Sequence, residues 1–316
     1  SVTLKSGDKV VDSVGSYFGM RKIALGKDEK GITRPMLNGK FVFQVGPLDQ
    51  GFWPDGIYTA PTDEALRWDI ETMKKHGFNC VRKHIKVEPS RWYYWCDKLG
   101  LMVWQDMPSA NSYLDGKDRE KPVPVDKPQY KTELINMVRS NWNHPSIIMW
   151  VVFNEEQGQH DTEALAAEVK GLDPTRLLNP ASGTTVWGKV HDTKSGDVMD
   201  VHIYPGPSSP TPTAERVAVL GEFGGLGFPV EGHKWSKNVW GYKNSADPKT
   251  WISEYEKLLA KTWELKDQPG LSGAIYTQLT DVESEGNGLV TYDREVIKMD
   301  IDRVKAANTG KPPVQP

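Results

Sequence analysis

The sequence has few cysteines, no long apolar run and little net charge, and each absence excludes a class of protein. Its two cysteines, Cys80 and Cys96, are too few for a disulfide framework or for a structural zinc site built on cysteine. The longest apolar run, residues 147–153, is far shorter than the roughly 20 residues that span a bilayer. With 39 Lys and Arg against 42 Asp and Glu, the formal charge is −3, so neither nucleic acid nor a membrane is expected as a partner.

Short apolar runs alternate with longer amphipathic segments along most of the chain. We predict strands at 41–45, 79–85, 101–104, 147–153, 176–178, 199–204, 216–221 and 273–279, and helices at 62–76, 90–99, 130–142, 161–170, 248–265 and 294–307. These segments make eight strand-then-helix units, in which the fifth and sixth helices have only a weak pattern, and they predict an α/β fold, a (β/α)8 TIM barrel. The alternative is an open doubly wound sheet, but no Gly-x-Gly-x-x-Gly turn follows its first strand.

The two ends of the chain do not fit this pattern. Residues 10–23 contain two β-like stretches, and the segment 16–21 has the character of an edge strand that needs a partner sheet. We interpret 1–23 as leftover strands of a preceding β-sandwich domain or as a linker, and 24–308 as the barrel. Residues 309–316 are polar and proline-rich, which predicts a disordered tail. The chain is therefore expected to be a catalytic module of a longer protein.

Two glutamates are placed where TIM barrels carry their chemistry, at the carboxyl ends of strands. One is Glu155 or Glu156, after the fourth predicted strand, and the other is Glu222, at the end of the seventh. A single glutamate in such a position is more often a solvated loop residue. Two that face one another across a barrel mouth are what hydrolysis of a glycosidic bond requires, because one donates a proton and the other attacks the sugar.

Several segments follow the order and spacing of the catalytic domains of glycoside hydrolase family 2, which includes β-galactosidases, β-glucuronidases and β-mannosidases. They are Asn38–Gly46, Asp69–Lys74, Gly77–Arg82 and Cys96–Trp104. His144–Glu155 resembles the acid/base strand of the family, which ends in Asn-Glu, and Val219–Gly224 resembles its nucleophile strand. The resemblance covers residues 16–308. Because the family places its acid directly after the asparagine, the resemblance implies Glu155 rather than Glu156.

The resemblance also implies a retaining mechanism and a set of substrate-binding residues. Glu222 would form a covalent glycosyl-enzyme, and Glu155 would act first as acid and then as base. Asn154 would bind the sugar 2-hydroxyl, while Tyr204 and Arg82 would hold Glu222 as a carboxylate. Further expected substrate contacts are His84, Asp106, His202, Trp187, Trp235, Trp240, Tyr276 and Gln278.

The chain is rich in tryptophan, with 12 against 8 phenylalanines and 11 tyrosines. Most of these indole rings are expected in the core. Trp104, Trp187, Trp235 and Trp240 fall on strand ends or loops, where a flat ring suits a sugar. Relatives commonly place a tryptophan beneath the sugar from the eighth strand, which here reads Tyr276-Thr-Gln, so either Tyr276 or a tryptophan of the long loop must form this platform.

We predict an exo-β-glycosidase of the β-galactosidase type that removes a terminal non-reducing sugar. A glucuronide is disfavoured, because family β-glucuronidases carry an Asn-x-Lys element before the last strand–helix turn, whereas this chain has Gly286–Arg294 there, without a lysine. A β-mannosidase or β-glucuronidase and a barrel that binds carbohydrate without hydrolysing it remain alternatives. The expected partners are a carbohydrate and upstream β-sandwich domains, without metal or cofactor, in a secreted or periplasmic protein.

Overall fold

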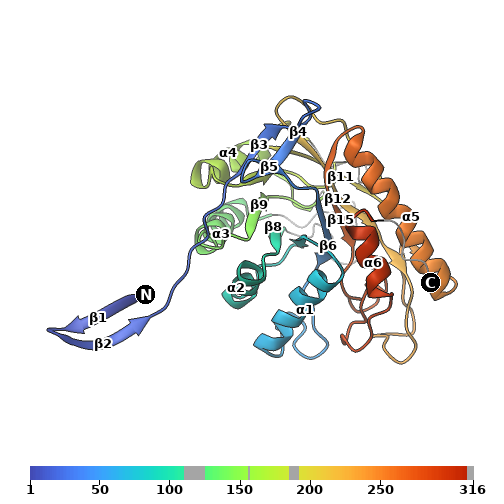
Figure 1. Ribbon diagram of the computed structural model, residues 1–316, viewed down its shortest axis with the longest axis horizontal. Helices are drawn as coiled ribbons and strands as arrows, with labels where there is room; N and C mark the ends of the chain where they lie inside the picture. Colours follow the sequence, from blue (N-terminus) through green and yellow to red (C-terminus); the bar gives the residue numbers. More distant parts are fainter. Residues whose placement is uncertain (110–124, 156, 185–191, 312–316) are drawn as a thin grey trace.

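Eight parallel strands form the centre of the computed structural model, which describes residues 1–109, 125–155, 157–184 and 192–311 (Figure 1). They are hydrogen-bonded in the order β10-β9-β8-β7-β6-β15-β12-β11. The backbone N–H of Asp197 donates to Leu178 O at 2.8 Å, which brings β10 beside β11 and nearly closes the barrel. The strands are β6 (Gln44–Asp49), β7 (Cys80–Lys83), β8 (Met102–Asp106), β9 (Ile147–Val151), β10 (Leu177–Asn179), β11 (Val198–Ile203), β12 (Val217–Gly224) and β15 (Leu271–Thr277). The predicted (β/α)8 fold is confirmed.

Helices cover the outside of this barrel after six of its strands (Figure 1). They are α1 (Asp63–Lys75), α2 (Ser90–Leu99), α3 (Lys127–Ser140), α4 (Thr162–Leu172), α5 (Pro248–Asp267) and α6 (Ile301–Asn308). Side chains cap the starts of three of these helices. Thr62 Oγ1 accepts the N–H of Ala65 at the start of α1. The carboxylate of Asp247 accepts the N–H groups of Lys249 and Thr250 at the start of α5, and that of Asp300 accepts the N–H of Arg303 at the start of α6. The crossovers after β10 and β11 have no helix in the described part of the chain.

Apolar side chains fill both sides of the sheet. The larger cluster lies between the sheet and the helices, and the smaller one fills the barrel interior with residues such as Leu48, Met149 and Ile275. Trp104 belongs to this interior. It is fully buried and its Nε1 donates to Gln44 Oε1 at 2.6 Å, so the expectation that it lines the mouth is wrong. The interior is a packed core rather than a pore.

A small antiparallel sheet of β3 (Ile23–Lys27), β4 (Thr33–Leu37) and β5 (Lys40–Phe41) lies at the amino-terminal end of the barrel. Ile23 belongs to the interior cluster, and Leu25 and Leu37 pack against it. This sheet therefore forms a floor beneath the barrel, opposite the carboxyl ends of the strands. Between β12 and α5, the short strands β13 (Leu226–Gly227) and β14 (Lys243–Asn244) pair with one another.

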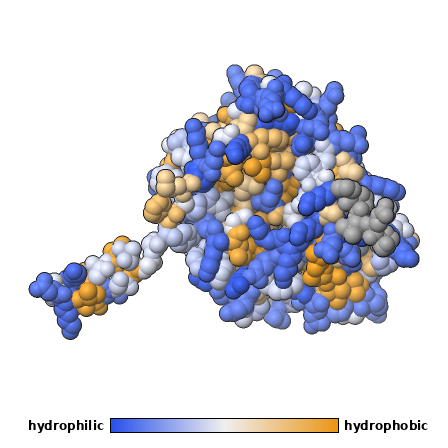
Figure 2. All heavy atoms as spheres, in the orientation of Figure 1, coloured by the Kyte–Doolittle hydropathy of each residue, from blue (hydrophilic) through white to orange (hydrophobic). Residues whose placement is uncertain are grey.

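The first residues form a hairpin of β1 (Val2–Ser6) and β2 (Lys9–Val14) that projects from the body, with apolar side chains exposed along it (Figures 1 and 2). The predicted edge strand at 16–21 is not a strand in the structure; its Phe18 and Met20 are 83% and 88% exposed. In the described part of the chain, no helix has both the length and the apolar character that crossing a membrane demands.

Candidate active site

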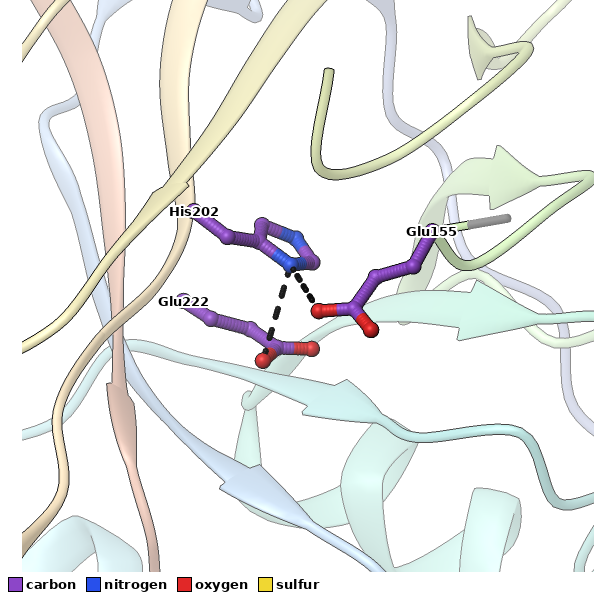
Figure 3. Close-up of side chains that lie close together, drawn as sticks. All are labelled: Glu155, His202 and Glu222. Carbon is purple, nitrogen blue, oxygen red and sulfur yellow. Dashed lines mark hydrogen bonds and ion pairs between the residues drawn. The ribbon is translucent and has the colours of Figure 1, made fainter. Parts of the chain in front are cut away.

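His202 lies between the two predicted catalytic glutamates at the carboxyl end of the barrel. Its Nδ1 is 3.0 Å from Glu155 Oε1 and 3.5 Å from Glu222 Oε2 (Figure 3). One ligand atom from each of the three side chains falls within 4.8 Å of the other two. Three separate strand ends, those of β9, β11 and β12, therefore bring these groups to one point, as the prediction from strand ends required.

Glu222 is held in its charged form by surrounding donors. Tyr204 Oη donates to Glu222 Oε2 at 2.6 Å and Arg82 Nη1 donates to Oε1 at 3.2 Å. His84 Nδ1 lies 3.8 Å from the same Oε1. Burial alone would raise the pKa of Glu222, but the charges of His202, His84 and Arg82 lower it, and its net pKa is below the ordinary value. An ionised carboxylate is the form that can act as a nucleophile.

Arg82 organises the centre of the site. Its side chain is fully buried, with Nε and Nη2 donating to the carboxylate of Asp106 at 3.1 and 2.8 Å. Nη2 also donates to Asn154 Oδ1 at 2.7 Å, which leaves the NH2 group of Asn154 as the end able to donate to a ligand. His84 Nδ1 lies 3.3 Å from Asp106 Oδ2. Arg82 and Asp106 are therefore held within the site as a fixed pair, beneath the residues that a ligand would reach.

Glu155 has fewer partners than Glu222. Its side chain is 21% exposed, against 7% for that of Glu222. Its backbone φ is 52°, in the left-handed region that side-chain-bearing residues rarely adopt, and its N–H donates to Ser182 O at 2.8 Å. Backbone strain of this kind concentrates at functional sites. Here it turns the side chain toward His202 and the open mouth (Figure 3).

A second polar group lies behind His202. The Ser182 hydroxyl donates to Asp200 Oδ2 at 2.6 Å and lies 2.7 Å from His202 Nε2. Asp200 Oδ1 also accepts the N–H of Gly221 at 2.7 Å, and a Cβ at position 221 would come within 2.3 Å of that oxygen. Burial alone would lower the pKa of His202, but Glu222, Glu155 and Asp200 raise it above its ordinary value. A proton on either Nδ1 or Glu155 therefore completes the 3.0 Å hydrogen bond between them.

Aromatic rings line one side of the mouth. Tyr204 stacks on Tyr242 with ring centroids 3.6 Å apart and planes 3° from parallel, and Trp240 meets Tyr242 edge-on at 5.4 Å. Trp240 and Tyr242 are 45% and 48% exposed. Trp235 is also exposed but packs against Tyr292 instead, and Trp187 lies outside the described residues.

Tyr276 is not available to a ligand. It is fully buried and packs against Tyr255 of α5 at 4.8 Å and against Phe223 at 5.7 Å. The expectation that it forms a sugar platform is therefore wrong. Its neighbour Thr277 lies on the mouth side of β15 instead, with Oγ1 2.8 Å from Tyr204 Oη.

Gln278 belongs to a chain of amides on the side of the mouth formed by β6 and β15. Gln50 Nε2 donates to Gln278 Oε1 at 3.0 Å, and Gln278 Nε2 donates to Asn287 Oδ1 at 2.9 Å. Six residues around the site were not predicted from the sequence: Gln50, Asn287, Ser182, Asp200, Tyr242 and Glu285. Two of them carried a signal, because Gln50 follows β6 directly and Asp200 alternates with His202 on β11 and with Tyr204 just after it.

Among the residues that the structure describes, two groups of side chains have the spacing of metal ligands. The first is Glu155, His202 and Glu222, and the second is His233 with the exposed Asp293 and Glu295. In the first group, the ring of His202 is already hydrogen-bonded to Glu155, and Glu222 is hydrogen-bonded to Tyr204 and Arg82. The absence of a metal stays a prediction.

Known proteins resemble this chain in both sequence and fold. The family model for the TIM barrel domain of glycosyl hydrolases family 2 matches residues 59–220. A β-galactosidase from Lactococcus lactis is 33% identical over 181 residues, which are 55% of this chain and 18% of that protein. A putative β-glucuronidase from Formosa agariphila is 31% identical over 182 residues, or 56% of this chain and 16% of that protein. The chain thus spans less than a fifth of the length of these relatives.

Solved structures share the fold at lower sequence identity. A β-glucuronidase from Parabacteroides merdae superposes with a TM-score of 0.71 at 20% identity, over 98% of this chain and 43% of that one. A family 2 β-galacturonidase from Eisenbergiella tayi gives 0.70 at 18% identity, over 94% and 55%. The strand-end glutamates, the barrel that carries them and the family match over half of its length place this chain in glycosyl hydrolase family 2, as a TIM barrel domain of that family.

Proposed function

We propose that this chain hydrolyses a β-glycosidic bond with retention of configuration at the anomeric carbon. The observation that carries the proposal is the spacing of its two glutamates, whose nearest carboxylate oxygens lie within 4.8 Å of one another on either side of His202. Retaining glycosidases hold their carboxyl groups about 5–5.5 Å apart, whereas inverting enzymes hold them about 6.5–9.5 Å apart to admit a water.

The surroundings of each glutamate support separate roles. Glu222, ionised and fixed by Tyr204 and Arg82, attacks the anomeric carbon to form a glycosyl-enzyme. Glu155, more exposed and hydrogen-bonded to His202, gives its proton to the leaving oxygen and then takes one from water. Asn154 directs its NH2 group to a sugar hydroxyl, and Tyr242 with Trp240 offers an aromatic face to the ring.

The proposed substrate is a terminal non-reducing β-galactoside. The support comes from the relatives named β-galactosidase, and from the segment Gly286–Arg294, which has no lysine that could act as the one in the Asn-x-Lys element of family β-glucuronidases. We also propose that upstream β-sandwich domains adjoin the hairpin β1–β2 in an exported protein. The projecting hairpin with its exposed Val2, Leu4 and Val11 supports such a neighbour.

Covalent trapping tests the proposal. The chain is incubated with 2,4-dinitrophenyl 2-deoxy-2-fluoro-β-galactoside, whose fluorine slows the breakdown of a glycosyl-enzyme. The expected result is a mass increase of one fluorosugar, mapped to the peptide that contains Glu222, and none in Glu222→Gln. Glu231→Gln, which removes an exposed glutamate from the loop after β12, is the matched control and should label as the parent does. Labelling at another residue, or turnover in which the product first appears as the α-anomer, would contradict the proposal.

A further inference from the structure

The loop after β15 carries a glutamate that the proposed mechanism does not use. Asn287 Nδ2 donates to Glu285 Oε1 at 3.0 Å, and Gln50 Nε2 donates to Oε2 at 3.2 Å. The backbone on either side of Glu285 pairs with Trp240, whose N–H donates to Ser284 O at 2.9 Å and whose carbonyl accepts from Gly286 at 2.8 Å. Both the side chain and the backbone of Glu285 are therefore fixed.

The amides that hold Glu285 are themselves oriented by the barrel. Gln50 directly follows β6 and Gln278 directly follows β15, and the two are hydrogen-bonded at 3.0 Å. Gln278 in turn fixes the amide of Asn287 at 2.9 Å. The Glu285 carboxylate is the acceptor at the end of this chain. Each of its oxygens receives one hydrogen bond from these amides and retains a lone pair for a further donor.

Glu285 shares its electrostatic surroundings with the catalytic glutamates. Burial raises the pKa of Glu285, the negative charge of Glu222 raises it further and His84 opposes them. Glu222, Glu285 and Glu155 all act on the hydroxyl of Tyr242, whose pKa is raised first by burial and then by these three charges. The geometry agrees, because Trp240, whose backbone pairs with Ser284 and Gly286 on either side of Glu285, packs edge-on against Tyr242 at 5.4 Å.

A purely structural carboxylate on the same loop looks different. Asp281 pairs with the buried ammonium of Lys298 at 2.6 Å, and this pair accounts for its charge. Of the ion pairs between described residues, none includes Glu285. A half-buried carboxylate without a cationic partner, near a second carboxylate, costs folding free energy and is typical of a functional site.

We infer that Glu285 is a specificity-determining residue that accepts hydrogen bonds from hydroxyl or ammonium groups of the bound sugar and excludes a uronic acid. A neutral or amino sugar offers donors to the free lone pairs of Glu285. A uronate offers a carboxylate, which is an acceptor only and carries the same charge. The inference rests on the proposed function, and it names the substrate class of that site.

The variant Glu285→Gln tests this inference, with Glu283→Gln as the matched control. Glu283 is an exposed glutamate on the same loop, so the control removes the same charge. We measure kcat/KM on nitrophenyl β-galactoside and nitrophenyl β-glucuronide. Glu285→Gln is expected to lower kcat/KM for the galactoside roughly 10- to 100-fold, the range for a lost hydrogen bond to a charged group. The ratio of glucuronide to galactoside activity should rise at least about tenfold, while Glu283→Gln stays within about twofold on both.

Monodeoxy galactosides separate recognition from loop structure. The deoxy compound that lacks the contacted hydroxyl should lose activity with the parent chain and lose little more with Glu285→Gln, because the partner is already gone. A merely structural role would lower all substrates in proportion, and this outcome overturns the inference, as does a parent chain that prefers the glucuronide. If the fluorosugar labels Glu222 but the ratio does not move, only the inference fails; if the parent chain is not labelled, the proposed function fails with it.

Discussion

Arg82 and Lys83 are neighbours on β7, and each is a fully buried cation in contact with two carboxylates. Adjacent residues of a strand point to opposite faces, so the two cations lie in different surroundings. Arg82 contacts Asp106 and Glu222. Lys83 contacts Asp49 at 2.6 Å and Glu88 at 2.8 Å.

The two clusters differ in how their charges balance. Around Lys83, a second lysine, Lys86, lies 3.0 Å from Glu88, so two lysine side chains meet the two carboxyl groups of Asp49 and Glu88. Around Arg82, the carboxylates outnumber the permanent cations. The other groups beside these carboxylates that can carry a positive charge are His84 and His202. Equal numbers of buried lysines and carboxylates therefore mark a stabilising cluster, whereas an excess of carboxylates beside histidines marks the site of the proposed chemistry.

The largest expected effect comes from removing the nucleophile. Glu222→Gln should lower kcat by roughly 10⁴-fold or more, because an amide is not a nucleophile and no covalent intermediate can form. Steady-state assays on a nitrophenyl galactoside measure this. The unfolding midpoint in urea should change little in comparison, and a variant that keeps a tenth of the parental kcat would contradict the distinction between the two clusters.

Replacing the proposed acid/base should have a smaller effect that depends on the substrate. Glu155→Gln should cost about 10²–10⁴-fold on an alkyl galactoside, whose leaving group needs a proton. On a dinitrophenyl galactoside the first step needs no protonation, so a burst of dinitrophenol should precede slow turnover. Equal losses on both substrates, without a burst, would be evidence against this role.

In the cluster around Lys83, a substitution should lower the free energy of unfolding rather than the activity. Lys83→Met leaves Asp49 and Glu88 short of one cation, and removal of one partner of a buried pair costs about 3–5 kcal/mol of the free energy of unfolding. Urea unfolding measures this loss. The kcat per folded molecule should stay near that of the parent. A large fall in kcat with unchanged stability would mean that this cluster takes part in the chemistry.

The smallest expected effect is a shift in the pH profile. His84 lowers the pKa of Glu222, so the parental nucleophile stays ionised at pH values below 4.5, the ordinary pKa of a glutamate side chain. His84→Gln removes that positive charge, so the pKa of Glu222 rises and the acidic limb of kcat/KM moves to higher pH. Profiles of the two proteins between pH 3.5 and 8 measure the shift. A limb that moves to lower pH would contradict the assignment.

Sequence reasoning placed seven of the eight barrel strands well because their ends are marked, but the first was predicted at 41–45 and β6 is Gln44–Asp49. The wholly apolar β9 and the helix α2, whose bounds match the prediction, are examples. The residues Arg82, Asn154, His202 and Glu222 were found because they lie at or just after the carboxyl ends of strands, which meet on one edge of the sheet. Their distances to one another, and the left-handed backbone of Glu155, depend on the folded barrel.

The register of β15 shows why the remaining residues of the mouth could not be predicted from the sequence. This strand is buried along its whole length, so no alternation of polar and apolar residues reveals which face each side chain takes. A shift of one residue in the assumed register exchanges the two faces. Tyr276, which was expected at the mouth, faces α5, and Thr277 faces the mouth instead. The amide chain from Gln50 to Glu285 also depends on loop conformations that have no periodic signal.

The floor of β3–β5 beneath the packed barrel leaves the mouth as the route for every molecule that enters or leaves the proposed site. The departing alcohol must therefore clear the same passage through which the hydrolytic water arrives. An alcohol present at high concentration competes with that water for the glycosyl-enzyme, because both reach it through the mouth. The relative access of water and alcohol through this opening would therefore set how much sugar is hydrolysed and how much is transferred.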